Sequence, residues 1–217
     1  MRAELLALFP EGVVGAETFD LAGAEPPLEE ERELVARAVP KRVQEFAAGR
    51  QCARQALSQL GIAPQPLLAV ERAVQWPEGV VGSITHTDHF AAAVAAPSAS
   101  FAGVGIDVEQ KDRVQPRLWK QIAVPEEVAW LQQDPSLAEL HGTILFSAKE
   151  AFYKAQYCIS QAWVGFKDVV LRVGDGTFVV ELTTDVERLA PSGTTFEGRY
   201  AVVGGLVVTG LACLHPR

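Results

Sequence analysis

The chain has 217 residues, of which 48% are hydrophobic and 8% aromatic, a composition typical of a folded globular protein rather than a disordered one. Its formal net charge of −8 and its pI near 5.1 argue against a nucleic-acid binder, which normally carries a basic excess to neutralise phosphates. No run of apolar residues approaches the roughly 18 to 20 that a membrane span needs, and the N-terminus lacks the apolar core and cleavage site of a signal peptide.

The first half of the chain is predicted to contain one long helix and several short strands. Residues 1–27 contain Gly and Pro with little periodicity, which predicts loop with at most one short strand. The composition becomes helical from Glu29, and Pro40 fits the first turn of a helix that ends near Gly61. The stretches GSITH and FAAAVAA follow as short strands, and GVGIDVEQ, residues 103–110, is another.

The second half is predicted to begin with helices and to end with strands. Residues 110–140 indicate a connection and a helix that begins near PEEVAWLQQ, where acidic residues in the first turn suit the helix dipole. HGTILFSAKEAFYKAQY, residues 141–157, is a strong helix. FKDVVLRV and TFVVELTT predict one β-hairpin, and FEGRYAVVGGLVVTGLACL predicts a second around Gly204 and Gly205. We therefore expect an α+β fold of two lobes, each built from a helix and strands, which meet within residues 97–115.

The stretch GVGIDVEQ raises a question of charge. Three aliphatic residues alternate with Gly105, Asp107 and Glu109, the period of a half-buried strand, so both carboxylates lie on the same face. Like charges at neighbouring positions of one face repel each other. A cation held between the two carboxylates would explain the pattern, but a solvated strand face would give the same pattern.

The helix at residues 141–157 carries a carboxylate in an unexpected place. One apolar stripe is sufficient to dock the helix: Ile144, Leu145, Ala148, Phe152 and Ala155. Glu150 lies in a second stripe, which is aromatic. A simple ion pair from Glu150 to Lys154 would contribute only a few tenths of a kcal/mol. A carboxylate among aromatic residues costs free energy unless a cation or hydrogen bonds satisfy it, which weakens that simple interpretation.

Together, Asp107, Glu109 and Glu150 would supply three hard oxygen ligands. Mg²⁺ prefers a few protein carboxylates and completes its octahedron with water and phosphate oxygens. A D-x-E pair alone is more often a solvated strand face than a metal site. The additional K-E-x-x-x-K helix makes a metal site the better prediction.

The helix that begins at Pro40 carries basic residues that suit a phosphate. Arg50 lies in line with the apolar seam of this helix, and Arg54 lies four residues later on the same face. Long Arg stems often only cover apolar surface, but two guanidinium groups on one face, with Lys41 and Arg42 near the helix start, also fit a phosphate clamp. His86, at the end of GSITH, is one of only four histidines and carries little meaning alone.

In this order, GSITHTDHFAAAVAA, GVGIDVE and FSAKEAFYKA resemble the three signatures of the surfactin-type 4′-phosphopantetheinyl transferases. FAAGRQCARQAL is similar to the subgroup typified by the enterobactin synthetase component D enzymes. The resemblance covers residues 40–157, and the ordered set is far more specific than any single motif. It implies two similar lobes (a pseudo-dimer), residues 1–105 and 106–217, each a small antiparallel sheet with a packed helix, and an active site in the cleft between them.

The resemblance also implies a reaction, the transfer of phosphopantetheine from coenzyme A to a serine of an apo acyl, peptidyl or aryl carrier protein, with release of adenosine 3′,5′-bisphosphate. The metal ion would be Mg²⁺, with Mn²⁺ as the alternative. The residues that match the family's functional positions fall into three roles. The metal ligands would be Asp107, Glu109 and Glu150; the catalytic residues Glu150 and Lys154; and the coenzyme A ligands Arg50, Arg54, His86, Lys149 and Lys154.

Two positions fit the family pattern less closely. Glu126 lies roughly where the family often has another acidic residue. Ala151 stands where Ser is frequent after the K-E pair, a departure that touches no proposed role.

Four basic residues between the D-x-E strand and the next helix indicate either a docking patch for the carrier protein or a solvated loop: Lys111, Arg113, Arg117 and Lys120. The subgroup resemblance favours siderophore peptide synthesis, while other peptide-synthetase, polyketide and fatty-acid carriers stay open. Two other functions remain as alternatives, a Mg²⁺-dependent phosphoesterase and a non-catalytic module that binds coenzyme A or a carrier protein.

The cysteines indicate the cellular compartment of the protein. Cys52, Cys158 and Cys213 are odd in number, widely separated and without C-x-x-C spacing, which favours reduced thiols in a cytoplasmic protein. A chain that holds both lobes has no need of a second copy, so we expect a monomer.

Overall fold

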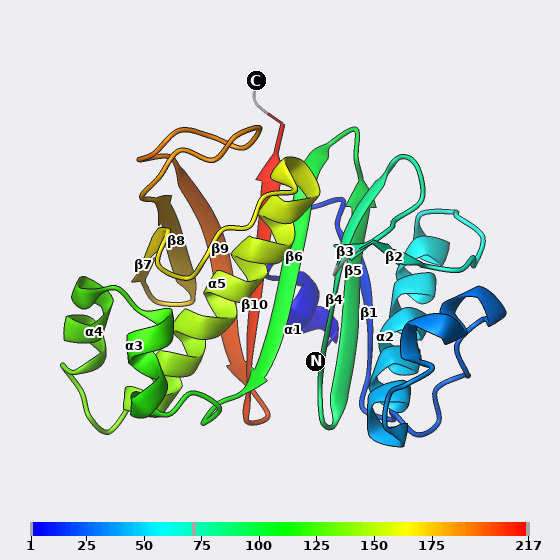
Figure 1. Cartoon of the computed structure of the whole chain (residues 1–217), viewed down its shortest axis with the longest axis horizontal. Helices are drawn as coiled ribbons and strands as arrows, with labels where there is room; N and C mark the ends of the chain where they lie inside the picture. Colours follow the sequence, from blue (N-terminus) through cyan, green and yellow to red (C-terminus); the bar gives the residue numbers. More distant parts are fainter. Residues whose placement is uncertain (1, 71–72, 216–217) are drawn as a thin grey trace.

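Two antiparallel sheets, each covered by one long helix, form the α+β architecture of the computed structural model, which describes residues 2–70 and 73–215 (Figure 1). The helices are α1 (Arg2–Leu6), α2 (Pro40–Gln59), α3 (Trp119–Ile122), α4 (Pro125–Leu131) and α5 (Ala138–Ser160), with 3₁₀ turns η1 (Glu29–Val35) and η2 (Pro116–Leu118). The strands are β1 (Val14–Thr18), β2 (Ala69–Val70), β3 (Ala73–Val74), β4 (Val80–Thr87), β5 (Phe90–Pro97), β6 (Phe101–Gln110), β7 (Val169–Val173), β8 (Thr177–Leu182), β9 (Thr195–Val203) and β10 (Leu206–Leu214).

The N-terminal lobe is a three-stranded sheet in the order β1-β5-β4, covered on one face by α2. Its central strand β5 alternates Phe90, Ala92, Val94 and Ala96 on the face toward the second sheet with three alanines on the face toward α2. Small side chains on the helix side let α2 approach closely. As predicted, Pro40 stands in the first turn of α2, and Gly61 follows its end with a φ of 76°.

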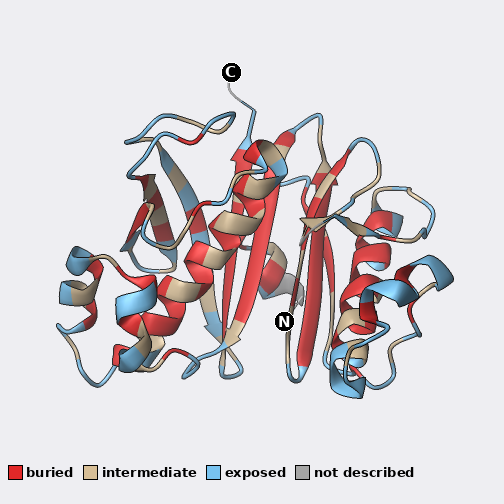
Figure 2. Ribbon diagram, viewed as in Figure 1, coloured by how far each residue is buried: buried red, intermediate tan, exposed pale blue. Residues whose placement is uncertain are grey.

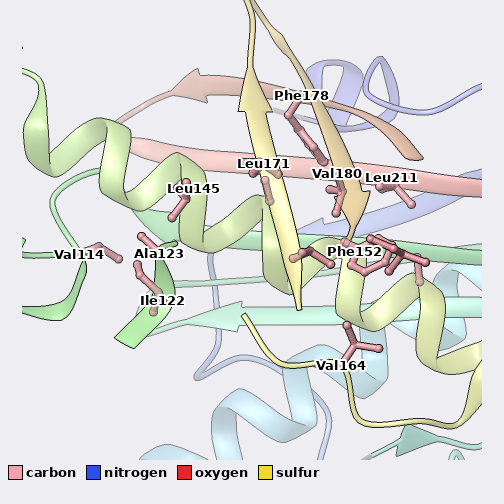
Figure 3. Close-up of a cluster of buried hydrophobic side chains, with 14 of the residues drawn as sticks. Val114, Ile122, Ala123, Leu145, Phe152, Val164, Leu171, Phe178, Val180 and Leu211 are labelled. Atoms are coloured by element: carbon pink, nitrogen blue, oxygen red, sulfur yellow. The ribbon is translucent and has the colours of Figure 1, made fainter. Parts of the chain in front are cut away.

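The C-terminal lobe is a five-stranded sheet in the order β6-β10-β9-β8-β7, against which α5 packs. The apolar stripe predicted for α5 is buried there, and Leu145 and Phe152 contact strand residues such as Leu171 and Val180 (Figure 3). The predicted β9–β10 hairpin turns at two glycines with positive φ, Gly204 and Gly205. The expected helix near PEEVAWLQQ is α4.

A hydrophobic cluster joins the two lobes. Phe90 and Val94 from β5 face Ile106 and Val108 from β6, and the short helix α1 lies behind them. Figure 2 shows buried residues that run through β4, β5, β6 and β10. Residues 1–27 were expected to be loop with at most one short strand, which is β1, and α1 was not expected, because a five-residue helix owes its stability to this packing rather than to its own sequence.

The lobes also meet along β4 and β6, which lie side by side but belong to different sheets. The main-chain N–H of Ile106 donates to Ser83 Oγ at 3.1 Å, and that of Val108 donates to Thr85 Oγ1 at 3.1 Å. The boundary predicted between residues 105 and 106 falls inside β6. Because β6 pairs with β10 from Phe101 onward, we propose that the division lies in the turn before Phe101.

Helix α5 lies directly on β6, and glycine makes this possible. A Cβ at Gly105 would stand 1.9 Å from the carbonyl oxygen of Ala151, and one at Gly103 would stand 2.2 Å from the carbonyl oxygen of Ala155. Both distances are far below van der Waals contact, so no other residue fits without moving the helix.

We predict that Gly105→Ala lowers the free energy of unfolding by about 3 kcal/mol, the upper end for overpacking, because its Cβ meets helix backbone that has no room to yield. Gly174→Ala is the control, since its Cβ would meet only the Thr177 hydroxyl at short range, at 2.7 Å, and that side chain can rotate. Urea denaturation measures both. Equal losses in the two variants would contradict the contact between α5 and β6.

Candidate active site

Charged side chains from both lobes gather where α2, β4, β6 and α5 meet. The N-terminal lobe contributes Arg42 and Glu45 from the start of α2 and His86 from β4. The C-terminal lobe contributes Asp107 and Glu109 from β6 and Glu150 and Lys154 from α5. Asp107 and Lys154 both influence the pKa of His86, so the two halves form one electrostatic unit.

Asp107 is the most deeply placed of these carboxylates, with 5% of its surface exposed. Its Oδ1 accepts a hydrogen bond from Lys154 Nζ at 2.7 Å and a longer one from the Thr85 hydroxyl at 3.4 Å. Lys154 also donates to the carbonyl of Ile106 at 3.1 Å. The alternative of a solvated strand face is therefore wrong for Asp107, which faces α5 instead of water.

Glu109 and Glu150 stand near Asp107 in a partly desolvated setting. Burial raises the pKa of Glu109 to about 7, and the negative charges of Asp107 and Glu150 add to that rise while Arg113 and Lys154 oppose it. Burial likewise raises the pKa of Glu150, with Lys154 opposing and Asp107 assisting. The nearby cationic side chains therefore do not fully compensate the negative charge of these carboxylates.

The donor set fits a hard divalent cation. Asp107 Oδ2 is buried and has no hydrogen-bond partner in the structure, which is the state expected of an oxygen reserved for a ligand. Carboxylate oxygens are the donors that Mg²⁺ and Mn²⁺ accept. Among residues 2–70 and 73–215, however, no three His, Cys, Asp or Glu side chains already stand in a ready-made metal cluster. Asp107, Glu109 and Glu150 would therefore have to adjust their positions to share one ion.

His86 is held between a cation and a carboxylate. The Arg42 guanidinium contacts its Nε2, and Glu45 Oε2 lies 3.5 Å from its Nδ1 and 3.3 Å from Arg42. Because a guanidinium only donates, Nε2 accepts and the ring proton belongs on Nδ1, toward Glu45. Burial above all, and then the charge of Arg42, lower the pKa of His86 to about 4 against the opposing charge of Glu45, so the ring is neutral at pH 7.

Arg50 and Arg54 do not contact His86. Both are buried against Glu31, which accepts two hydrogen bonds from Arg54 at 3.0 and 3.1 Å, and Arg50 donates to the carbonyl of Leu67 at 2.9 Å. These contacts attach η1 and the segment before β2 to α2. The structure brings Arg42 to His86 in their place, and a phosphate role for Arg50 and Arg54 stays a prediction.

Lys149 is buried, and a coenzyme A role for it stays a prediction. Its ammonium is buried in an ion pair with Glu127 at 2.7 Å and also donates to the carbonyls of Phe166, Ile122 and Val169 at 2.6, 3.0 and 3.3 Å. Residues 149 and 150 point about 100° apart on a helix, so Lys149 does not share the surroundings of Glu150. Glu127, rather than the neighbouring Glu126 singled out from the sequence, is the buried acidic residue of α4.

A cavity of about 280 Å³ opens beside Glu150 and Lys154. Its walls are mostly apolar and include Phe152, Tyr153, Val164 and Phe166, and the exposed Trp163 stands at its rim against Tyr153. A long, thin organic group that enters this cavity would have one end next to the charged cluster.

Sequence reasoning did not single out Glu45 or Thr85, and it gave Arg42 only a supporting role. The pairing of Arg42 with Glu45 follows from their i,i+3 spacing at the start of α2. The contact between Arg42 and His86 spans 44 positions, a separation at which no local pattern carries a signal.

Comparisons with known proteins cover both lobes. Residues 30–96 match a family described as 4′-phosphopantetheinyl transferase N-terminal domain, and residues 103–202 match the 4′-phosphopantetheinyl transferase superfamily. The 4′-phosphopantetheinyl transferase PptT of Mycobacterium tuberculosis is 38% identical over 193 residues, 85% of either chain. Svp of Streptomyces mobaraensis is 38% identical over 98% of this chain and 90% of its own. Enterobactin synthase component D of Escherichia coli K12 is 35% identical over 59% of this chain and 60% of its own.

We predict that Lys149→Met lowers the free energy of unfolding by about 3–5 kcal/mol, because it leaves the buried Glu127 carboxylate without its counter-charge. Arg172→Met is the matched control, since Arg172 pairs with Glu181 at the same 2.7 Å but on the surface, and it should cost about 0.5 kcal/mol or less. Chemical denaturation compares the two. A Lys149→Met protein as stable as Arg172→Met would refute a structural role for the buried pair.

Proposed function

This chain belongs to the 4′-phosphopantetheinyl transferase superfamily, and we propose that it transfers 4′-phosphopantetheine from coenzyme A to a serine of an apo acyl, peptidyl or aryl carrier protein. One observation carries the proposal. Three carboxylates and Lys154 lie together at the junction of the lobes, opposite Arg42 and His86 and beside an apolar cavity. Coenzyme A has one part for each of these features. Its pyrophosphate would meet a cation held by the carboxylates, its further phosphate would meet Arg42 and His86, and its long uncharged arm would enter the cavity.

In the proposed reaction the serine oxygen attacks the phosphorus that carries the pantetheine arm. A new P–O bond forms to serine, the P–O bond to the leaving phosphate breaks, and adenosine 3′,5′-bisphosphate departs with the electron pair. The serine proton passes to a base. Such a phosphoryl transfer depends mainly on in-line positioning and on neutralisation of charge.

The family typically uses a divalent metal. For this chain we propose Mg²⁺, with Mn²⁺ as the alternative, held by Asp107, Glu109 and Glu150. When bound, the ion would supply positive charge beside the pyrophosphate oxygens. The buried, unpartnered Asp107 Oδ2 and the raised pKa of Glu109 support this placement.

Lys154 and Glu150 have the surroundings for the catalytic roles. The Lys154 side chain is 26% exposed, so its ammonium can turn from Asp107 toward an incoming phosphate and balance the charge of the leaving group. Burial raises the pKa of Glu150 and so favours proton uptake, whereas a bound cation would lower its basicity. We propose that Glu150 accepts the serine proton, directly or through a water molecule.

Arg42 and His86 would face the 3′-phosphate of coenzyme A. The Arg42 side chain is 48% exposed, and it lies in the N-terminal lobe across from the carboxylates. Arg50 and Arg54, with side chains only 7% exposed, would support α2 from behind rather than meet the phosphate first. The apolar cavity beside Glu150 would take the pantetheine arm.

Carrier protein would dock next to the site. Lys111, Arg113, Arg117 and Lys120 are all exposed and follow directly on the strand that carries Glu109. Carrier proteins are often acidic, so a local basic patch offsets the net charge of −8 of this chain. The match to enterobactin synthase component D supports a carrier of siderophore peptide synthesis, with other peptide, polyketide and fatty-acid carriers as alternatives.

We also propose a monomer in the cytoplasm. Both lobes of the site come from one chain, and Cys52, Cys158 and Cys213 are free thiols, as is usual in reducing compartments. Separately, no helix within residues 2–70 and 73–215 is long and apolar enough to cross a membrane.

The decisive experiment combines the purified protein with coenzyme A, Mg²⁺ and several apo carrier proteins, and records intact masses with and without EDTA. We expect a metal-dependent gain of one phosphopantetheine. Asp107→Ala and Glu150→Ala should lower the rate at least 10²-fold with thermal unfolding near that of the wild type. Coenzyme A bound but uncut would instead indicate a binding module, and coenzyme A cleaved without transfer would indicate a phosphoesterase.

The docking patch has its own test. A variant with Arg117→Glu and Lys120→Glu should raise the KM for an acidic carrier protein about 10-fold, leave the KM for coenzyme A unchanged, and lose the salt dependence of kcat/KM. Arg172→Glu with Arg188→Glu makes the same charge change elsewhere on the C-terminal lobe and should leave both KM values unchanged. Equal effects from the two variants would mean that only the global charge matters.

A further inference from the structure

The joint between β4 and β6 is made by side-chain hydroxyls. β6 is the edge strand of its sheet, paired with β10 on one side, and the N–H groups of Ile106 and Val108 point away from β10. Both residues are fully buried, so these N–H groups need a partner. Ser83 and Thr85 supply it, each through its oxygen at 3.1 Å.

Both hydroxyls accept one main-chain hydrogen bond, but only one of them also contacts a side chain of the site. Ser83 receives the N–H of Ile106, and the structure records no other hydrogen bond for its hydroxyl among the described residues. Thr85 receives the N–H of Val108 and directs its own hydroxyl at Asp107 Oδ1, 3.4 Å away. Thr85 is 3% exposed and cannot exchange this contact for water.

Thr85 therefore holds Asp107 from the N-terminal lobe, while two other groups hold it from the C-terminal lobe. Lys154 binds the same Oδ1, and the Thr209 hydroxyl lies 3.4 Å from the Asp107 carbonyl. With Oδ1 held on one side, Oδ2 is left free and buried. Lys154 can swing away toward a phosphate, but Thr85, on a buried strand, cannot.

We infer that Thr85 is a positioning residue that orients the Asp107 carboxylate for the divalent cation, so that metal affinity depends on the joint between the lobes. The inference rests on the proposed function, which places the cation at Asp107. Hydrogen-bond partners of ligating carboxylates fix ligand orientation, and their loss typically weakens metal binding about 10- to 100-fold.

The test compares hydroxyl-free variants at the two positions of the joint. Thr85→Val keeps the shape of the side chain and removes its hydroxyl. Ser83→Ala removes the other hydroxyl of the joint. Thr85→Ser keeps a hydroxyl at position 85 and removes only the methyl group. Mn²⁺ is titrated into each protein and followed by electron paramagnetic resonance. We expect a Kd about 10-fold higher for Thr85→Val, and a change below about twofold for Ser83→Ala and Thr85→Ser.

Two further readouts separate positioning from general damage. Amide hydrogen exchange should quicken at Val108 in Thr85→Val and at Ile106 in Ser83→Ala, which shows that each variant opened its own half of the joint. In transfer assays, Thr85→Val should raise the Mn²⁺ concentration for half-maximal rate while the KM for coenzyme A stays within about twofold. If Thr85→Val does not fold, Thr85→Ala is measured instead.

The outcomes are distinct. Suppose first that Asp107→Ala loses the ion. Equal Mn²⁺ affinities for Thr85→Val and Ser83→Ala, or wild-type affinity in Thr85→Val, would then overturn the inference about Thr85 and leave the metal site standing. If Asp107→Ala binds Mn²⁺ as tightly as the wild type, the proposed metal site fails and the role of Thr85 fails with it.

Discussion

The contact of α5 with β6 is the constraint on which the site depends. Because Gly103 and Gly105 present no side chain, the helix backbone lies against the strand, and residues on its near face reach the strand's own atoms. Lys154 thus bonds both the carbonyl of Ile106 and the carboxylate of Asp107. A helix held further away by ordinary side chains would leave Glu150 and Lys154 out of reach of the D-x-E strand. The absence of a Cβ at Gly103 and Gly105 therefore determines how closely Glu150 and Lys154 approach the strand.

Burial and charge oppose each other throughout this cluster. Taking carboxylates out of water costs free energy, and the raised pKa values of Glu109 and Glu150 record that cost. A protein under selection for stability alone would replace such groups with apolar ones, since even paired buried charges seldom outperform a well-packed core. The buried pair of Lys149 and Glu127 is different, because four acceptors surround the ammonium. The Lys149–Glu127 pair is thus fully hydrogen-bonded, whereas the cluster of Asp107, Glu109 and Glu150 keeps a buried oxygen, Asp107 Oδ2, without a hydrogen-bond partner among the described residues.

The sequence predicted the parts of the structure that repeat locally. Periods of two and 3.6 residues placed α2, α5 and the strands from β4 to β10, and the ordered motifs led to the family that the comparisons confirm. Local periodicity could not predict contacts between segments that are far apart in the sequence. Lys149 differs from Glu150 only by its helix face, and its partner Glu127 lies 22 positions away. Arg42 reaches His86 only because α2 packs against β4 within the N-terminal lobe, and α1 is stable only because it packs between the two lobes.

The division of labour between the lobes resolves an apparent conflict of charge. A chain with a net charge of −8 must bind a substrate with several phosphates. The N-terminal lobe contributes the positive charge of Arg42, which contacts a neutral His86 and pairs with Glu45. The C-terminal lobe places its carboxylates together, where the proposed divalent ion would change a site that repels phosphate into one that attracts it. The relative position of these two halves then decides whether one substrate can satisfy both, and this position is set where Ser83 and Thr85 receive the N–H groups of β6.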